Sequence, residues 1–307
     1  MKRRHFLKAA WAAMPVLAVG LLAACAPKPV SIVGKAVGIR FGIVTDAHYA
    51  DCQAREGRPF RESLAKMEEC VAVMNRERVD FLIELGDFKD QDEVPVEART
   101  LAYLRRIESA FGRFLGPRYH VLGNHDQDSL SKEQFLNAVE NTGIPKGWSF
   151  YGFDVRGVRF LVLDANFDAK GAPYDHGRFA WADTNIPAHE IDWLRSELVA
   201  SSKPVVVFIH QQLDGAGDYY VKNAAKVRSM LEQSGKVLAV FQGHRHEGAY
   251  SRIGGIHYYT LKGMIEGLGP ENNSYAVVDV APSGDMIVRG FRKADSLTLE
   301  KNKKEAK

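Results

Sequence analysis

Several short apolar runs in this 307-residue chain end in aspartate, histidine or asparagine, the side chains whose oxygen and nitrogen atoms bind divalent metal ions. Five runs are followed directly by such residues: Asp46 with His48, Asp87, Asn124 with His125, His210, and His244 with His246. One histidine at a strand end is usually a hydrogen-bonded core or surface residue, and Gly-Asp is usually a turn. Five strand ends that carry only Asp, Asn and His favour a shared site instead.

The elements that would bring these residues together alternate in type along the first half of the chain. Strand-like runs at 39–45, 81–85 and 119–122 are separated by helical spacing of apolar residues at 61–75 and 101–114. This β-α-β-α-β order predicts a parallel sheet with crossover helices. Because functional side chains gather at the carboxyl ends of parallel strands, we expect the candidate ligands to converge on one edge of the fold.

The second half of the chain predicts a mixed sheet. Its expected elements are a hairpin over 151–166 that turns at Arg156-Gly157, a helix with Ile191, Leu194 and Leu198 on one face, strands over 205–209 and 237–241, and hairpins at Gly254-Gly255 and Pro282-Ser283-Gly284. The polar stretch 166–186 predicts a loop over the site. Residues 293–307 are charged and predict a loose tail after a domain that spans 39–292.

The N-terminus has the composition of an export signal. Its head KRRHFLK resembles the twin-arginine export signal, and LAAC resembles a bacterial lipobox, in which Cys25 becomes the lipidated first residue. The alternative is an ordinary N-terminal transmembrane anchor, but the apolar stretch is short and contains Pro15. We therefore expect a signal peptide over 1–24, a lipidated tether over 25–38, the twin-arginine translocase as a partner during export, and a lipid-anchored protein in the periplasm or cell envelope.

Removal of this signal changes the charge and cysteine content. The loss of Lys2, Arg3, Arg4 and Lys8 leaves 37 of the 41 basic residues against 38 acidic ones, so the formal net charge changes from +3 to −1. A near-neutral domain argues against nucleic acid as a partner, because phosphate neutralisation supplies most of that affinity. With Cys52 and Cys70 alone remaining, the chain is not a disulfide scaffold, and whether these two cysteines pair is left open.

The ordered motifs DAH, GD, GNHD, H and GHRH resemble the calcineurin-like metallophosphoesterase superfamily over residues 46 to 246. The resemblance implies an α/β fold, a four-layer αββα sandwich with two mixed β-sheets and a metal site at the carboxyl ends of the strands. It implies one metal held by Asp46, His48, Asp87 and His246, and a second held by Asp87, Asn124, His210 and His244. Asp87 would then bridge the two ions.

The chemistry implied is hydrolysis of a phosphorylated small molecule by a metal-bridged hydroxide. Mixed oxygen and nitrogen ligands suit Mn, Fe or Zn and do not choose among them. His125 would face the substrate and either stabilise charge or protonate the leaving group. Asp90, three residues after the bridging aspartate, would orient His125, and Asp126 is a second candidate for that role.

Three further stretches resemble the manganese-dependent ADP-ribose/CDP-alcohol diphosphatases: RPFRESLAKMEECV, IDWLRSEL and GHRHEGAY with LKGMIEG. The resemblance favours manganese and makes nucleoside diphosphate derivatives the candidate substrates. The first motif departs from the pattern, because those relatives tend to carry Gln where His48 stands. The alternatives are a broad phosphomonoesterase or phosphodiesterase that scavenges phosphate, and a non-catalytic envelope lipoprotein. The mature charge argues against a nuclease.

Overall fold

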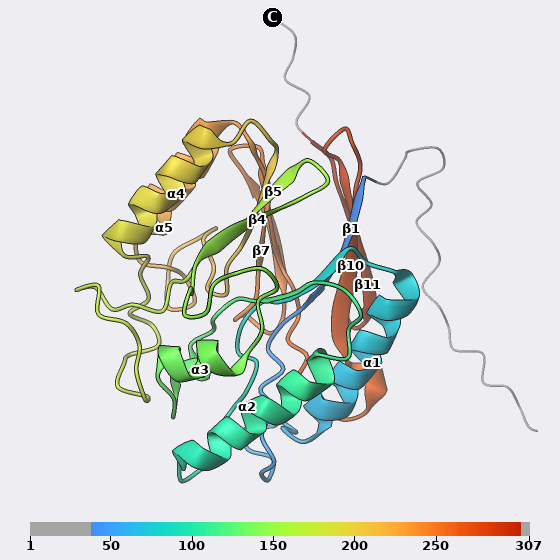
Figure 1. The fold of residues 1–307 in the computed structure, drawn as a ribbon, viewed down its shortest axis with the longest axis vertical. Coiled ribbons are helices and arrows are strands. Elements are labelled where there is room, and N and C mark those ends of the chain that lie inside the picture. The colour runs from blue at the N-terminus through green and yellow to red at the C-terminus, as the bar shows by residue number, and fades with distance from the viewer. Residues whose placement is uncertain (1–37, 302–307) are drawn as a thin grey trace, which may run out of the picture. The chain divides into compact units, whose positions relative to one another are not determined.

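The structure is a computed structural model that describes residues 38–301 (Figure 1). Two six-stranded sheets form its centre, and helices lie on their outer faces. This arrangement confirms the predicted α/β fold with two mixed sheets. The expected signal peptide, the lipidated Cys25 and all but the last residue of the tether lie outside the described residues.

The first sheet contains the three parallel strands predicted from the N-terminal half. Its order is β12 (Leu297–Leu299), β11 (Met286–Arg292), β10 (Ser274–Val280), β1 (Ile39–Val44), β2 (Phe81–Glu84) and β3 (Arg118–His120). Strands β1, β2 and β3 run parallel, whereas β10 pairs antiparallel with β1. The carboxyl ends of β1, β2 and β3 therefore lie at one edge of this sheet.

The second sheet is built from the hairpin and strands of the second half. Its order is β4 (Tyr151–Val155), β5 (Val158–Val162), β6 (Val205–Phe208), β7 (Val237–Gln242), β9 (Ile256–Thr260) and β8 (Ala249–Ile253). Strands β5, β6, β7 and β9 run parallel, and β4 and β8 close the edges antiparallel. The predicted turn at Arg156-Gly157 is confirmed, with both residues at positive φ.

Helices cover the outer face of each sheet and leave the inner faces to pack on one another (Figure 1). The helices are α1 (Glu62–Glu77), α2 (Glu97–Phe111), α3 (Lys132–Ala138), α4 (Ala188–Ala200) and α5 (Ala224–Ser234), with 3₁₀ turns η1 (His125–Gln127) and η2 (Pro270–Asn272). Buried side chains of α1 and α2 pack with the first sheet, and those of α4 and α5 pack with the second.

Aromatic side chains join the two sheets. The ring of Phe41 on β1 lies edge-on to Phe160, Phe208 and Phe241 of the second sheet, with centroid distances of 5.6, 5.7 and 5.6 Å. Each edge-to-face pair of this kind adds about 0.5–1.5 kcal/mol beyond its buried area. The sheets are thus held at a fixed spacing, which fixes the distance between their strand ends.

Some elements differ from the sequence-based expectations. Helices α3 and α5 were not predicted, although Ala224, Val227 and Leu231 give α5 a buried stripe. The predicted tail at 293–307 is corrected in part, because Leu297–Leu299 form the edge strand β12 against β11. Leu299 is buried, so this charged segment carries an apolar anchor. Cys52 and Cys70 are not bonded to one another.

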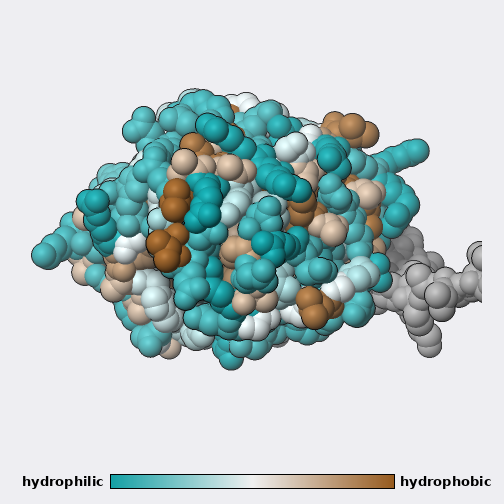
Figure 2. Space-filling view, turned by 90° about the horizontal axis from the view of Figure 1, so that it is seen from below, coloured by the Kyte–Doolittle hydropathy of each residue, from teal (hydrophilic) through white to brown (hydrophobic). Residues whose placement is uncertain are grey.

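The described residues contain no helix that is both long enough and apolar enough to span a bilayer. Figure 2 looks at the molecule from below the view of Figure 1, where the loop after β1 lies. Hydrophilic side chains dominate this face, and the hydrophobic ones are scattered among them.

A buried acid–imidazole cluster lies at the ends of β2 and β3. His120 Nε2 lies 3.1 Å from Glu108 Oε2, and His120 Nδ1 lies 3.7 Å from Glu84 Oε2. Burial raises the pKa of Glu84 from 4.5 to about 8, against the opposing hydrogen bond of His120. Burial alone would lower the pKa of His120, but Glu108 and Glu84 raise it from 6.5 to about 9. Both groups therefore hold their protons more tightly in the folded state than in the unfolded state.

We expect this cluster to make stability fall as pH rises. The contribution of the Glu84 proton is complete below pH 4.5 and is lost as pH rises through about 8, because the folded pKa lies above the unfolded one. Glu84→Gln should therefore gain thermal stability relative to wild type between pH 5 and 9, measured in chelator. The exposed Glu93→Gln should follow wild type. If the melting temperatures of E84Q and wild type change with pH in parallel, the raised pKa of Glu84 does not contribute to stability.

Candidate metal centre

The candidate ligands lie where the carboxyl ends of strands from both sheets meet. Asp46 and His48 follow β1, and Asp87 follows β2, whereas His210 and His244 follow β6 and β7 of the second sheet. The backbone at these ends is strained: Asp46, His48, Asp87 and His244 have φ of 52°, 45°, 56° and 68°. Non-glycine residues at positive φ cost energy and cluster at functional sites.

One group of ligand atoms comes from Asp46, His48 and His246, and all lie within 4.8 Å of one another. His246 Nε2 lies 3.2 Å from Asp46 Oδ1 and 3.3 Å from His48 Nε2. Two imidazole nitrogens bound to one ion at about 2.1 Å would stand roughly 3.0–3.4 Å apart. The separation therefore fits two nitrogens that bind the same ion.

A second group comes from Asp87, His210 and His244, again within 4.8 Å. Asp87 Oδ2 lies 3.1 Å from His210 Nε2 and 3.5 Å from His48 Nε2, so this carboxylate faces both groups. Asn124, which follows β3, is 4% exposed. All seven residues predicted as ligands are thus found at the edge where the two sheets meet.

Asp46, Asp87 and His210 are each held by the polar atom on the other side of the side chain. Thr45 Oγ1 and the His244 amide donate to Asp46 Oδ2 at 2.7 and 3.1 Å. The His125 amide donates to Asp87 Oδ1 at 2.8 Å, and His210 Nδ1 donates to the Leu85 carbonyl at 2.8 Å. These bonds leave the opposite atoms facing the centre, the usual arrangement around protein metal sites.

Two of the candidate ligand atoms, Asn124 Oδ1 and His244 Nε2, are buried and have neither a hydrogen-bond nor an ion-pair partner among residues 38–301. Leaving one such atom unsatisfied costs about 1–3 kcal/mol. Oxygen and imidazole nitrogen are the donors that divalent ions take, so these atoms fit a site for such ions.

The glycines of the GN and GH motifs allow this packing. A Cβ at Gly123 would overlap with Asp87, and one at Gly243 would overlap with Thr45 and Asp46. Any larger residue would displace a candidate ligand or its support. The glycine of each motif is therefore needed for the close approach of its backbone to these side chains, and the residue after it supplies a candidate ligand.

The charge states of Asp46, Asp87 and His244 suit metal binding. Burial opposes ionisation of Asp46, but His246 and His48 hold its pKa well below the usual range, and His210, His125 and His48 do the same for Asp87. Burial and the charge of His210 lower the pKa of His244 to about 3. Two carboxylates are thus ionised, and His244 offers a neutral nitrogen lone pair.

The environment of His125 corrects one prediction. Asp128 Oδ2 lies 2.7 Å from His125 Nδ1, whereas Asp90 Oδ2 lies 3.7 Å away and is 3.1 Å from His48 Nδ1. The residue that orients His125 is therefore Asp128, and Asp90 supports His48. The reason is η1, whose single turn brings the residue three positions after His125 onto the same side. Burial opposes charge on His125, but Asp128, Asp87 and Asp90 raise its pKa to about 10.

Asp126, the second candidate for orienting His125, has a different contact set. Its carboxylate accepts hydrogen bonds from the amides of Gly123 and Asp87 at 2.8 and 3.1 Å, and from Phe88 at 3.0 Å. The buried ammonium of Lys89 donates to the His125 carbonyl. These bonds join the loops after β2 and β3, so Asp126 sets the backbone that carries the motifs.

Glu266 supports His246 and was not singled out by the sequence. Its Oε1 lies 2.6 Å from His246 Nδ1. The segment 263–267 that carries it bonds through its amides to the carbonyls of Thr45, Asp46 and His246. On the other side, the buried ammonium of Lys66 on α1 donates to the carbonyls of Met264 and Gly267 at 2.8 and 2.7 Å. The segment thus links the Asp46 loop to the His246 loop.

We expect Glu266→Gln to weaken metal binding by about 10–100-fold, the usual cost of removing a carboxylate behind a metal-binding histidine. Titration of Mn²⁺ into the metal-free protein by calorimetry measures this directly. The exposed Glu271→Gln, from the same loop region, is the matched control. Unchanged affinity in E266Q would show that His246 is oriented by its packing alone.

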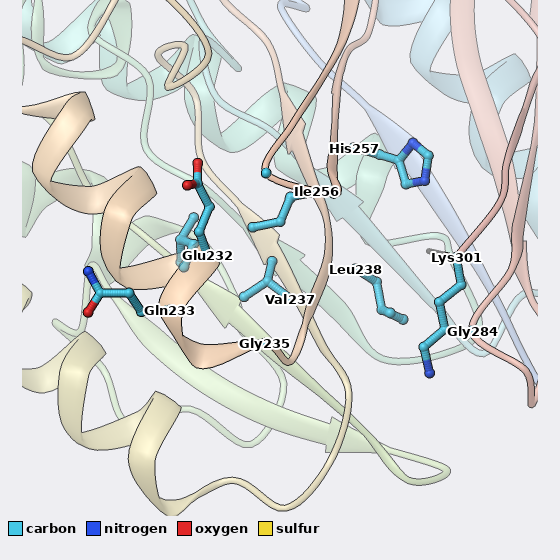
Figure 3. A pocket seen from close by; sticks show the side chains of 12 residues that line it. Glu232, Gln233, Gly235, Val237, Leu238, Ile256, His257, Gly284 and Lys301 are labelled. Carbon is cyan, nitrogen blue, oxygen red and sulfur yellow. The ribbon is translucent and has the colours of Figure 1, made fainter. Parts of the chain in front are cut away.

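A cavity of about 460 Å³ opens over the candidate ligands. Its walls include His125 and Asp128, and the loop predicted at 166–186 contributes Gly177, Phe179 and Trp181, as expected for a loop over the site. A larger cavity of about 650 Å³ lies among Glu232, Val237, His257 and Lys301 (Figure 3). It shares no lining residue with the first cavity and contains no candidate ligand.

Comparison with known proteins gives concordant matches. The calcineurin-like phosphoesterase family model matches residues 39–248. A manganese-dependent ADP-ribose/CDP-alcohol diphosphatase of Oryza sativa subsp. japonica is 25% identical over 302 residues, covering 83% of this chain and 92% of the relative. The protein of the same name in Arabidopsis thaliana is 26% identical over 286 residues, covering 78% and 90%. The crystal structure of a dimetal phosphatase from Danio rerio has a TM-score of 0.72 at 20% identity, covering 87% and 100%.

These matches agree with the fold and the site. The matched region 39–248 contains every motif that supplies a candidate ligand, and the distant homology to the diphosphatases extends over most of the chain. The two-sheet architecture is that of a known dimetal phosphatase. The chain belongs to the calcineurin-like phosphoesterase family and is a metal-dependent hydrolase of that family.

Proposed function

We propose that the protein hydrolyses the diphosphate bond of nucleoside diphosphate derivatives such as ADP-ribose and CDP-alcohols, with two divalent ions, preferably manganese. The observation that carries the proposal is the carboxylate of Asp87, which faces both groups of candidate ligand atoms. Asp46, His48, Asp87 and His246 would hold one ion, and Asp87, Asn124, His210 and His244 the other. When bound, such ions supply hydroxide near neutral pH and polarise the phosphoryl oxygens.

His125 acts on the substrate side of this centre. Its ring lines the cavity, and its neighbouring carboxylates keep it charged, which suits a group that donates a proton to a leaving oxygen. Asp128 holds Nδ1, so Nε2 is the atom left for the substrate. Asp90 fixes His48 and adds negative charge near His125.

Two aromatic side chains favour a substrate with a flat ring. Trp181 and Tyr219 are 43% and 44% exposed, line the cavity and lie 5.6 Å apart. Each also contacts the His244 ring, at 5.7 and 5.4 Å. Exposed aromatics beside a phosphate-binding centre suit stacking of a nucleobase, which is worth about 1–3 kcal/mol. The names of the Oryza and Arabidopsis relatives support the same substrate class and the choice of manganese.

Product analysis tests the proposal. Purified protein in Mn²⁺ is incubated with ADP-ribose, CDP-choline, a nucleoside monophosphate and an aryl phosphodiester. We expect the first two to yield nucleoside monophosphates. Preference for the other two would replace the proposal with a broad phosphatase or phosphodiesterase, and failure to act on all four would overturn it.

We also propose that the enzyme is exported and lipid-anchored at Cys25. The support is the twin-arginine pattern in residues 2–8 followed by LAAC. Cell fractionation tests this proposal. The wild-type protein should be in the membrane fraction, and the Cys25→Ala variant should be absent from that fraction. An unchanged distribution would contradict lipidation.

A further inference from the structure

A second cavity adjoins the candidate metal centre. It measures about 410 Å³ and shares Arg58, Tyr219, His244 and His246 with the cavity over the ligands. Its remaining walls include Lys262 and Lys293 together with Glu247 and Glu266. Three cationic side chains therefore surround a space that opens beside the same two imidazoles.

The backbone at Arg58 is held in place. Arg55 and Arg58 form an antiparallel bridge, closed by a hydrogen bond of 2.8 Å from the Arg58 amide to the Arg55 carbonyl. The two residues between them, Glu56 and Gly57, have φ of 51° and 78°, the positive values that tight hairpin turns require. The guanidinium of Arg55 donates to the Gln91 carbonyl at 2.8 Å and covers the Phe60 ring.

Arg58 differs from its cationic neighbours in the partners that its side chain has among the described residues. Lys262 Nζ lies 2.9 Å from Asp295 Oδ1, and Lys293 Nζ donates to the Glu266 carbonyl at 2.6 Å. Within residues 38–301, the half-buried Arg58 guanidinium forms neither a hydrogen bond nor an ion pair. A partly buried guanidinium without an anionic partner is unfavourable, so binding of an anion here would be stabilising.

Glu247 and Glu266, the two carboxylates that line this cavity, form no ion pair with Arg58 among residues 38–301. Glu266 is already occupied by His246, and Glu247 lies 3.6 Å from Arg245. The acidic side chains of this cavity thus have other partners, and Arg58 stays available to a ligand.

We propose that Arg58, with Lys262 and Lys293, binds the phosphate of a diphosphate substrate that is not attacked. The proposal rests on the diphosphatase function proposed above and assigns its selectivity to this cavity. A guanidinium presents paired N–H groups that match phosphate oxygens, and the attacked phosphate lies next to it over the ligands. An aryl phosphodiester has no second phosphate, so it gains nothing from Arg58.

Arg58→Gln tests this selectivity. Loss of a hydrogen bond to a charged group, about 1.5–3 kcal/mol, corresponds to a fall of roughly 10–150-fold in kcat/KM for ADP-ribose and CDP-choline. Hydrolysis of the aryl phosphodiester should stay within about twofold of wild type, and R58K should restore part of the loss because it keeps the charge. Arg61→Gln is the matched control, since Arg61 is exposed and paired with Asp51.

Equal losses on diphosphate and aryl substrates, or none on either, would overturn the role of Arg58. Equilibrium binding of ADP and AMP to the Mn²⁺-loaded protein gives a measurement that needs no turnover. R58Q should weaken ADP binding by the factor given above and leave AMP binding unchanged. If wild type cleaves no diphosphate but R58Q still loses ADP selectively, the proposed function fails and the subsite stands. If ADP and AMP weaken alike, the subsite fails.

Discussion

Replacing Asp87 by asparagine is expected to reduce metal-dependent hydrolysis by at least about a thousandfold, the effect of losing several kcal/mol of metal-based stabilisation. A single oxygen of the Asp87 carboxylate, Oδ2, lies 3.1 Å from His210 Nε2 and 3.5 Å from His48 Nε2. An amide keeps the bond from the His125 amide to Oδ1 but removes the charge that holds two cations together. Initial rates on ADP-ribose in Mn²⁺ measure the loss.

The metal content of the same D87N preparation should be lower than the two ions per chain expected for wild type. Asp192→Asn is the control, because Asp192 is exposed on α4 and pairs only with Arg195 among the described residues. Circular dichroism checks that both variants fold. Full activity in folded D87N would exclude the dinuclear site and, with it, the proposed function.

Replacing His125 by glutamine is expected to lower kcat by about 10²–10⁴-fold on a phosphodiester with an alkoxide leaving group while both metal ions stay bound. His125 holds its proton because Asp128, Asp87 and Asp90 outweigh the cost of burial and raise its pKa to about 10. A proton donor matters most when the leaving oxygen is a poor leaving group. The loss should therefore be much smaller for a p-nitrophenyl ester, whose phenolate leaves without protonation.

Asp128→Asn separates orientation from proton donation. It keeps His125 but weakens the 2.7 Å contact to Nδ1, so an intermediate loss with the same dependence on leaving group is expected. Equal losses of H125Q on both kinds of ester would assign His125 to charge stabilisation instead of acid catalysis. Loss of metal from H125Q would show that it acts through the backbone next to Asn124.

The sequence predicts the strand ends well because the ligands follow short apolar runs that are typical of buried strands. Asp46, Asp87 and Asn124 end three parallel strands of one sheet, as the β-α-β order requires. That His210 and His244 come from a second sheet does not change the outcome, since both sheets point their carboxyl ends at the same edge. The ligand positions are thus set by local order and chain direction.

Contacts that depend on the packing of separate segments were missed or misassigned. Glu266 reaches His246 across a segment held by Lys66 on α1, and no local pattern connects these three residues. The i+3 spacing of Asp128 from His125 in HDQD is a local signal of their contact. The resemblance assigns the orienting role to Asp90, whereas the turn after β3 places Asp128 closer to His125 and leaves Asp90 against His48.

The division of the ligands between two sheets couples metal affinity to the docking of those sheets. Four candidate ligands follow strands of the first sheet and three follow the second, so neither sheet alone offers a complete set. Bound metal should oppose separation of the sheets by about 2.7 kcal/mol at a free concentration of one hundred times Kd. By the same linkage, weakening the contacts of Phe41 between the sheets should lower the affinity for the metal ions. The yield of folded enzyme should then follow the metal supply of the compartment in which the chain folds.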